Sequence, residues 1–360
     1  MARVVNNDLS RWRRTIVLSD LHAHAALFDR MLEELEFGER DLLVVCGDLL
    51  LRGSENLPLL RRAVELSGRE NVVLLGGNCD AAFEFLASRP DGPELGRWLR
   101  EHPFPRELLA AEGGPQEGVS PGALRDRLLA RFARARRFLA ALPDVLVTPQ
   151  AVFVHGGLPG PDLAAAPGWD SDACRKNDDY LAHAPVLDRP VMVGHWPATL
   201  YRAEHPDFSP LWDAEKRVLS IDGGLGVKPE GQLNAVVIPG GDFGRREYRA
   251  LDELPVLRAL DPQAGTENSL YIRWGDNRVE RGERRDEFTY VRHLRTGRAL
   301  WARTDDLWEE NGRTCCADST DWLLPVVPGD LLRLVADTTR GRLVKKNGAV
   351  GWYKGRCEEP

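Results

Sequence analysis

The sequence lacks any long hydrophobic run. No apolar stretch in the 360 residues approaches the roughly 20 residues that a helix needs to cross a bilayer. The amino-terminal stretch MARVVNNDLSRWRR has no apolar core of the kind that a secretory signal needs. We therefore expect a soluble protein that is not exported and that works in the cytoplasm, without a membrane partner.

Paired cysteines are also missing. Six cysteines are scattered along the chain without a CxxC pair or a regular spacing, at Cys46, Cys79, Cys174, Cys315, Cys316 and Cys357. This pattern argues against a zinc ribbon and against a disulfide framework. It is typical of a protein that works in a reducing compartment.

The chain has no surplus of positive charge. Its formal net charge is -7 at pH 7, so electrostatics give no reason to expect nucleic acid or an anionic membrane as the main partner. A local exception is residues 122–144, which we predict as one amphipathic helix with six arginines. A solvated cationic face explains these arginines better than a patch that steers substrate.

Short apolar runs alternate with helical stretches up to about residue 250. Five of the runs predict β-strands: TIVLSD, DLLVVCGD, NVVLLGGN, AVFVHGG and VMVGH. Between the first two, AALFDRMLEELEFGER has helical periodicity and a glycine stop, which is typical of a βαβ unit. The alternation predicts an α/β domain, and open α/β sheets carry their chemistry at the carboxyl ends of parallel strands.

Each of these five predicted strands leads to a polar side chain that can bind a metal ion. The motifs, in chain order, are Asp20-Leu21-His22, Gly47-Asp48, Gly77-Asn78, His155-Gly156-Gly157 and Gly194-His195. Each motif is weak alone, but together they supply six oxygen or nitrogen ligands at strand ends. Mixed carboxylate, imidazole and amide ligands suit a pair of divalent transition metals that share one carboxylate.

The order and spacing of these motifs resemble the calcineurin-like metallophosphoesterase superfamily over roughly residues 15–240. VFVHGGL, VGHWPA and IDGGLGVKPEGQLNAVVI are more similar to bacterial serine/threonine phosphatases and diadenosine-tetraphosphate hydrolases than to small phosphodiesterases with a final GHxH. The resemblance implies a β-sandwich flanked by helices, in αββα order. It also implies two divalent cations, with manganese expected and iron, zinc or nickel as alternatives.

The resemblance also implies roles for individual residues. The implied metal ligands are Asp20 and His22 for the first ion, Asp48 as the bridge, and Asn78, His155 and His195 for the second ion. Arg52, in GDLLLRG, matches the arginine that clamps phosphate in the family. The nucleophile implied by such a site is a hydroxide that bridges the two ions.

Two positions depart from the family pattern. GDxxDRG has become GDLLLRG, with Leu51 in place of aspartate, and GNH[E/D] has become GNCD, with Cys79 in place of histidine. In the family these two residues form a pair that supports the phosphate and the leaving-group oxygen. Loss of both partners leaves no buried carboxylate unpaired, so we interpret the site as adapted rather than damaged.

The group that protonates the leaving group is therefore open. The candidates are the Cys79 thiol and His24, which matches a histidine in GDIHGH versions of the bacterial phosphatases. A supporting or surface role is the alternative for His24. Arg175 is a candidate for a second phosphate contact, as is Lys176 beside it, and an exposed loop position is the alternative for both.

The character of the sequence changes from about residue 266. Short β-prone pieces such as SLYIRWG, EFTYVRHL and LLRLVADT replace the helical periodicity. We expect a catalytic domain at 1–250 and two small β-barrels at 266–312 and 313–360. GRLVKKNGAVGWYKGR resembles the end of a bacterial Src-homology-three-like domain, which implies a peptide or cell-wall ligand, with barrel packing of Trp352 and Tyr353 as the alternative.

The leading hypothesis is a two-metal phosphoesterase that hydrolyses a phosphomonoester, either a phosphoprotein or a small phosphoester. One alternative is hydrolysis of a phosphodiester or a dinucleoside polyphosphate, which the GNCD motif suggests. The other is a metal-binding scaffold without catalysis. We disfavour the scaffold, because loss of chemistry should erode the metal ligands and all six are present.

Overall fold

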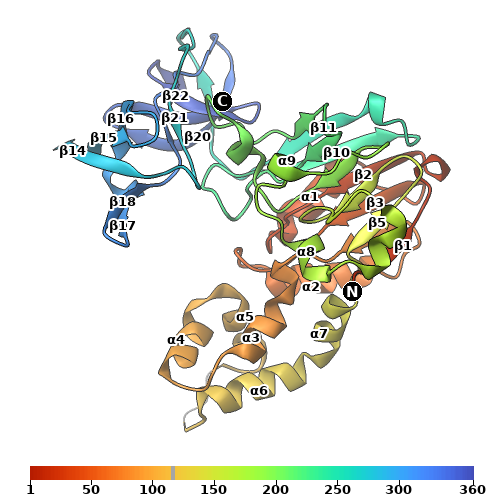
Figure 1. Cartoon of the computed structure of the whole chain (residues 1–360). Coiled ribbons are helices and arrows are strands. Elements are labelled where there is room, and N and C mark those ends of the chain that lie inside the picture. The colour runs from red at the N-terminus through yellow and green to blue at the C-terminus, as the bar shows by residue number, and fades with distance from the viewer. Residues whose placement is uncertain (115–117) are drawn as a thin grey trace. The chain divides into compact units, whose positions relative to one another are not determined.

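The computed structural model of the chain describes residues 1–114 and 118–360, which divide into two compact units (Figure 1). Unit 1 comprises Met1–Pro197 and Pro210–Asp252, and unit 2 comprises Ala198–Ser209 and Glu253–Pro360. Among the described residues, no helix combines the length and the apolar character that crossing a membrane requires.

Unit 1 contains two β-sheets. The five-stranded sheet has the order β11 (Glu247–Leu251), β10 (Leu233–Pro239), β2 (Arg14–Leu18), β3 (Asp41–Cys46) and β4 (Val72–Leu75). The six-stranded sheet has the order β1 (Val4–Asn6), β5 (Val145–Val147), β6 (Val152–Val154), β7 (Val191–Val193), β9 (Val218–Ser220) and β8 (Leu211–Asp213). The five strands predicted from the sequence are β2, β3, β4, β6 and β7, and all five are confirmed.

Each sheet of unit 1 contains three neighbouring parallel strands. In one sheet β2, β3 and β4 run parallel, and in the other β6, β7 and β9 do. Successive side chains on a strand point to opposite faces. Accordingly Val17 and Val44 enter a core shared with Phe153 and Met192 of the other sheet, while Ile16 and other alternate residues pack against helices.

One apolar cluster joins the five-stranded sheet to a set of helices, of which α3–α6 form a separate group in Figure 1. The helices that contribute to the cluster are α1 (Ala25–Glu34), α2 (Asn56–Leu66), α3 (Ala82–Ser88), α4 (Pro93–Glu101), α5 (Pro103–Ala111), α6 (Pro121–Arg131) and α7 (Ala133–Ala140). Two short helices, α8 (Ser171–Arg175) and α9 (Tyr180–His183), precede β7. The predicted fold class, a sandwich of sheets with flanking helices followed by all-β structure, is confirmed.

The prediction of one helix over residues 122–144 is wrong. The chain forms α6 and α7 instead, separated at Phe132, where the backbone leaves helical geometry with φ −98° and ψ 21°. The Phe132 ring stacks on Phe83, with ring centroids 6.3 Å apart, so the break allows a core contact. The arginines of this segment include surface partners of carboxylates, such as Arg131 with Glu112.

Unit 2 is all β apart from short turns. Its largest sheet has the order β22 (Ala349–Tyr353), β21 (Gly341–Lys346), β20 (Leu331–Thr338), β12 (Val256–Ala259) and β23 (Cys357–Glu358). A second sheet is formed by β14 (Val279–Arg285), β15 (Phe288–His293) and β16 (Ala299–Arg303). Unit 2 also contains two two-stranded sheets. One pairs β13 (Tyr271–Ile272) with β19 (Ser319–Thr320), and the other pairs β17 (Leu307–Glu310) with β18 (Arg313–Cys316).

Two separate hydrophobic clusters stabilise unit 2. One surrounds Trp322 and Val344, and the other surrounds Ile272 and Val291. The expected barrels at 266–312 and 313–360, with their likeness to Src-homology-three domains, stay predictions. The unit boundaries differ from the expected ranges, because residues 198–209 belong to unit 2, where Thr199 Oγ1 and the Tyr271 hydroxyl are hydrogen-bonded at 3.0 Å.

Candidate metal centre

The six predicted metal ligands all follow strands of unit 1. Asp20 and His22 come after β2, Asp48 after β3 and Asn78 after β4; His155 and His195 follow β6 and β7. Parallel strands in one sheet bring their carboxyl ends to one edge. Here two such edges, one from each sheet, supply ligands to one cluster.

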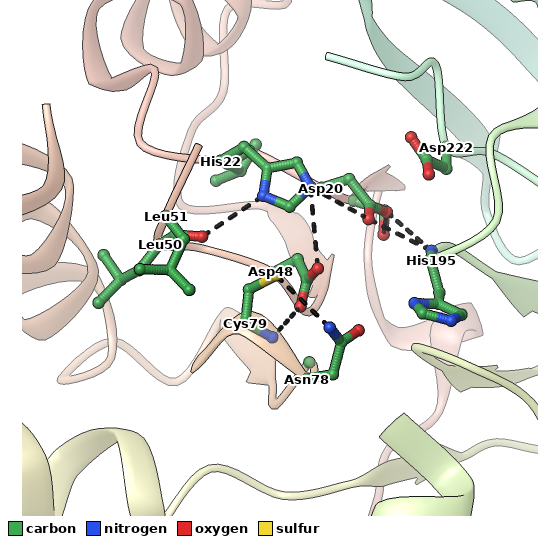
Figure 2. Close-up of polar contacts among 12 residues, drawn as sticks. Asp20, His22, Asp48, Leu50, Leu51, Asn78, Cys79, His195 and Asp222 are labelled. Atoms are coloured by element: carbon green, nitrogen blue, oxygen red, sulfur yellow. Dashed lines mark hydrogen bonds and ion pairs between the residues drawn. The ribbon is translucent and has the colours of Figure 1, made fainter. Parts of the chain in front are cut away.

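The first group of side chains is formed by Asp20, His22 and Asp48, and all three are buried. His22 Nε2 lies 3.9 Å from Asp20 Oδ1 and 3.8 Å from Asp48 Oδ2. Figure 2 shows the three side chains turned toward a common space, with Asn78 and Cys79 beside them. Separations of this size leave room for a cation between the ligand atoms.

The second group surrounds His155. Its Nε2 atom lies 3.2 Å from Asp48 Oδ1 and 3.2 Å from Asn78 Oδ1. The His195 ring is next to it, with centroids 5.3 Å apart. Ligand atoms of Asp20, Asp48 and His155 all lie within 4.8 Å of one another, as do those of His22, Asp48 and Cys79. Asp48 is the residue that the two triplets share.

The histidine rings have the orientation that metal ligation requires. His22 Nδ1 faces the Leu50 carbonyl oxygen at 3.4 Å, and His155 Nδ1 faces the Cys46 carbonyl oxygen at 2.7 Å. Each ring thereby donates its Nδ1 proton to the backbone and keeps Nε2 free to accept. His195 is reversed, because its Nε2 atom contacts Asp178 Oδ1 at 2.7 Å and leaves Nδ1 free. A ring nitrogen held by a carbonyl or carboxylate is typical of metal-bound histidine.

Burial controls the protonation of the cluster. Burial raises the pKa of Asp20 to about 7. The positive charge of His155 opposes this rise, and the negative charge of Asp48 adds to it. Burial lowers the pKa of His22 to about 4. At His155 the effect of burial is outweighed by the charges of Asp48 and Asp20, which raise the pKa to about 10. His155 therefore carries an extra proton at neutral pH, held by the neighbouring carboxylates, and a bound cation would displace it.

Backbone strain is concentrated at the same residues. Asp20, His22, Asp48 and His195 have positive φ angles of 55°, 44°, 53° and 67°. Residues other than glycine avoid this region, and such strain persists mainly where a functional site requires it. Four of the six predicted ligands therefore occupy conformations that folding alone disfavours.

Two glycines permit the close approach of the ligand loops. A Cβ atom on Gly77 would clash with the Asp48 carboxylate, and one on Gly194 would clash with Ser19 and with the Asp20 carboxylate. Neither position can carry a side chain without displacing a proposed ligand. Together with the ring orientations and the shared Asp48, this packing fits a pair of divalent cations.

Arg52, Cys79 and His24 lie beside the cluster. Arg52 is exposed, with a positive φ of 68°, and Cys79 is buried, with its backbone N–H donating to Asp48 Oδ1 at 2.8 Å. Burial raises the pKa of the Cys79 thiol, and the Asp48 charge adds to this, so the residue is a neutral thiol beside the carboxylates. His24 Nδ1 faces the Leu21 carbonyl oxygen at 3.1 Å. A side chain at Gly226 would meet Arg52, His22 and His24, so these three residues surround one point.

Arg175 is not brought to the cluster. Its Nε atom donates to Asp144 Oδ1 at 2.6 Å, and Nη2 donates to the Leu142 carbonyl oxygen at 3.3 Å. It lines a different hollow together with Met1 and Glu84. The expected second phosphate contact at this residue has no support, because the guanidinium is occupied by Asp144.

Sequence reasoning missed the residues that hold the ligands in place. Buried Asp80 accepts from the backbone N–H groups of Asp48 at 3.0 Å, Leu49 at 2.9 Å and Gly77 at 2.8 Å, and so ties the loop after β3 to the loop after β4. The motif GNCD contains this aspartate, and its position after two loop glycines was the available signal. Asp178 has no comparable signal, because it lies 17 residues from His195.

Asp222 is a further buried carboxylate near the cluster, on the side of Asp20 and His195 (Figure 2). Its Oδ1 atom accepts from the Gly224 N–H at 2.7 Å, while Oδ2 has no hydrogen-bond partner among the described residues. Burial, followed by the Asp20 charge, raises its pKa well above the usual value. Asp222 lies in the sequence segment IDGG, whose local pattern did not assign it to the site.

Comparison with known proteins identifies a family. A family model described as calcineurin-like phosphoesterase matches residues 13–213, which include all six proposed metal ligands. No curated protein sequence matches the chain.

Solved structures with a similar fold include three phosphoesterases. A candidate diadenosine tetraphosphatase has 17% identity and a TM-score of 0.46, over 70% of this chain and 98% of its own. A serine/threonine phosphatase from Saccharomyces cerevisiae with similarity to human PP5 has 13% identity and a TM-score of 0.46, over 70% and 84%. A metallophosphoesterase from Sphaerobacter thermophilus has 15% identity and a TM-score of 0.37, over 67% and 89%.

Proposed function

The chain belongs to the calcineurin-like phosphoesterase family of metal-dependent hydrolases, and we propose on this premise that it hydrolyses a phosphomonoester at the cluster around Asp48. The observation that carries the proposal is the shared carboxylate. Asp48 Oδ2 lies 3.8 Å from Nε2 of His22, which we assign to the first ion, and Asp48 Oδ1 lies 3.2 Å from Nε2 of His155, which we assign to the second. A single carboxylate between two sets of ligand atoms is the arrangement that a two-metal hydrolase requires.

The proposed ligands are those assigned from the sequence. Asp20 and His22 would hold one divalent cation, Asn78, His155 and His195 would hold the other, and Asp48 would be shared. Bound at these side chains, the two cations supply a water-derived nucleophile at neutral pH and neutralise charge on the phosphoryl oxygens. Manganese is our first expectation, since carboxylate, amide and imidazole ligands accept it.

The protein side chains orient the substrate. Arg52 is exposed at the rim of the cluster and can bind two phosphoryl oxygens with its planar guanidinium. Charge on these oxygens is then stabilised in the transition state by a donor that is already in place. Leu51 and Cys79 occupy the positions of the family's aspartate and histidine, so the usual oriented imidazole is missing from the leaving-group side.

The same absence favours a second candidate function. A phosphodiester or phosphoanhydride with an acidic leaving group needs little protonation as its bond breaks. Buried Cys79 is a weak proton donor, because burial and the Asp48 charge raise its pKa. Hydrolysis of a diester or a dinucleoside polyphosphate is therefore the alternative that the site supports.

The test is metal analysis followed by assays of the purified full-length chain. We expect two divalent ions per chain and Mn²⁺-dependent turnover of an aryl phosphomonoester. A phosphopeptide, an aryl phosphodiester and a dinucleoside polyphosphate, assayed in parallel, distinguish the substrate classes. Turnover of the monoester that persists after exhaustive chelation, at the same rate, contradicts the proposal.

A further inference from the structure

A pocket of about 670 Å³ adjoins the cluster in unit 1. It begins at Arg52, Asn78 and Cys79 and continues between helix α3 and the α4–α5 pair, which Figure 1 shows gathered together with α6. Its volume falls within the range of pockets that hold small organic ligands, about 300–1,000 Å³. The cluster itself needs room only for a phosphoryl group, so most of this space is available for another part of the substrate.

The walls of the pocket are aromatic. Phe85 of α3 is 45% exposed, which is unusual for a phenylalanine next to a buried cluster. Trp98 of α4 and Phe104 of α5 also line the pocket, with prolines at its side. Flat apolar surfaces of this kind contact planar rings well, because ring stacking adds to the gain from burial.

Arg89 provides a polar group on the pocket wall. Its guanidinium carbon lies 4.1 Å from the centroid of the Trp98 ring, so the indole holds the cation in a fixed plane. The Arg89 carbonyl oxygen accepts from Arg125 Nη1 at 2.5 Å, which fixes the backbone. Arg89 Nε is buried and has no hydrogen-bond partner among the described residues. Nε therefore lies away from the pocket surface, but Arg89 lines the pocket, and the other N–H groups of its guanidinium can donate to a ligand oxygen.

The charge of the pocket suits an anionic substrate. Arg52 and Arg89 both line it, and no aspartate or glutamate is among its lining residues in the described part of the chain. An anion entering the pocket therefore meets cations without carboxylate repulsion.

We propose that this pocket binds the organic part of the substrate, and that this part is a planar aromatic group carrying a hydrogen-bond acceptor that Arg89 recognises. The proposal rests on the proposed function, since it places the phosphoryl group at the metal cluster. It narrows the substrate class to phosphoesters with an aromatic group on the leaving-group side. Trp98 and Phe85 bind the ring, and Arg89 binds the acceptor.

Three esters with similar leaving-group basicity test the proposal. They are 2-(4-carboxyphenyl)ethyl phosphate, 2-phenylethyl phosphate and 2-cyclohexylethyl phosphate, which remove first the acceptor and then the planar ring. We expect kcat/KM to fall about 10-fold from the first to the second. A further fall of about 3- to 10-fold is expected from the second to the third.

Variants assign these differences to residues. Arg89→Met should remove the preference for the carboxylate and keep the preference for the phenyl ring over the cyclohexyl ring. Arg97→Met is the matched control, because Arg97 is exposed on the same helix as Trp98 and does not line the pocket. Trp98→Leu should reduce both preferences, and Trp98→Phe should retain the ring preference. Ratios between substrates are compared, so a general loss of active protein does not alter the result.

Binding of the corresponding phosphonates, measured by calorimetry on the Mn²⁺-loaded chain, separates the two proposals. If neither these esters nor the aryl phosphomonoester is hydrolysed but the phosphonates bind in the expected order, the proposed function fails and the pocket assignment stands. If the esters are hydrolysed at equal kcat/KM and the phosphonates bind equally, the pocket assignment fails and the proposed function stands. Phosphonates that do not bind, or an effect of Arg97→Met equal to that of Arg89→Met, overturn the pocket assignment.

Discussion

The two units bury polar groups in different ways. Unit 1 buries the carboxylates of Asp20, Asp48, Asp80 and Asp222 around one cluster, together with two histidines. Unit 2, all of whose residues are described, buries no aspartate or glutamate. Carboxylates are costly to bury unless they are paired or bind a metal. The fold of unit 1 therefore carries a local cost that metal binding can offset, and unit 2 carries none of this kind.

Backbone strain separates the units in the same way. In unit 2, the residues other than glycine with positive φ are Asn268, Asp286, Asn311 and Asn347. Asparagine and aspartate tolerate this region and favour turns. In unit 1 the corresponding residues include aspartates and histidines of the cluster, but also Ala23, Leu51 and Arg52, which tolerate this region poorly. Unit 2 uses residues suited to their turns, whereas unit 1 also keeps unsuited residues beside the proposed ligands.

Asp48→Asn gives the sharpest test of this comparison. The variant should bind fewer than two metal ions and lose at least about 10³-fold in turnover, since several kcal/mol of charge stabilisation depend on the shared carboxylate. Metal content by mass spectrometry and initial rates on an aryl monoester measure the effect. Asp261→Asn is the matched control, because Asp261 binds Arg356 in unit 2. Equal losses in the two variants contradict a functional difference between the units.

Leu51 and Cys79 predict a strong dependence on the leaving group. Without an oriented imidazole, aryl phosphates should react much faster than alkyl phosphates, because general acid catalysis is worth about 10²- to 10⁴-fold. Leu51→Asp with Cys79→His should raise alkyl turnover more than Cys79→His alone, since the aspartate orients the new ring. Equal wild-type rates on both ester classes, with chemistry limiting, would point to another acid, and His24 is the first residue to replace.

Trp322→Ala should affect stability without affecting the cluster. Trp322 is 9% exposed in unit 2, stacked on His205 with ring centroids 4.0 Å apart. Truncation of a buried tryptophan typically costs about 3–5 kcal/mol, so we expect an earlier thermal unfolding transition. Aryl turnover, measured below that transition, should be unchanged. Phe153→Ala, in the core between the two sheets of unit 1, should reduce both the thermal stability and the aryl turnover. A loss of turnover in folded, metal-loaded Trp322→Ala protein would link unit 2 to the site.

The strands, and the polar residues after them that we propose as ligands, could be identified from the sequence because both follow from local patterns. A buried parallel strand is a short apolar run, and the polar residue that ends it is its neighbour in the chain. Asp80 and Asp178 could not be assigned in this way, since they act through contacts with loops that only the fold brings near. The break at Phe132 was missed for a related reason, because the ring of Phe83 is 49 positions away.

The pocket could not be predicted from sequence motifs. Phe85, Arg89 and Trp98 lie in ordinary helical sequence, and their convergence depends on how α3, α4 and α5 pack. Arg175 shows the converse. Its position between two histidine motifs made it one candidate for a phosphate contact, with an exposed loop position as the alternative, but it forms an ion pair with Asp144. Proximity in sequence located the proposed metal ligands, while residues placed by tertiary packing escaped prediction.

Ala23→Gly measures the smallest difference, the strain stored beside the ligands. Ala23 has a φ of 59° and is fully buried. Glycine removes about 1–2 kcal/mol of left-handed strain. The substitution also costs about 0.8 kcal/mol of methyl burial. A further cost of about 0.5–1 kcal/mol arises because glycine makes the unfolded chain more flexible and so loses more conformational entropy on folding. We therefore expect almost no net change in the free energy of unfolding.

Ala63→Gly is the control for that measurement, because Ala63 is a buried residue within helix α2 and carries no such strain. It should lose about 2 kcal/mol from the same methyl group and from lower helix propensity. In unit 2, Asn347→Gly should change stability by less than about 0.5 kcal/mol, since asparagine already tolerates its φ of 52°. Denaturant unfolding gives all three values. Equal losses at Ala23 and Ala63 would mean that the loop after β2 stores no strain, and that the ligand residues are no more constrained than the turns of unit 2.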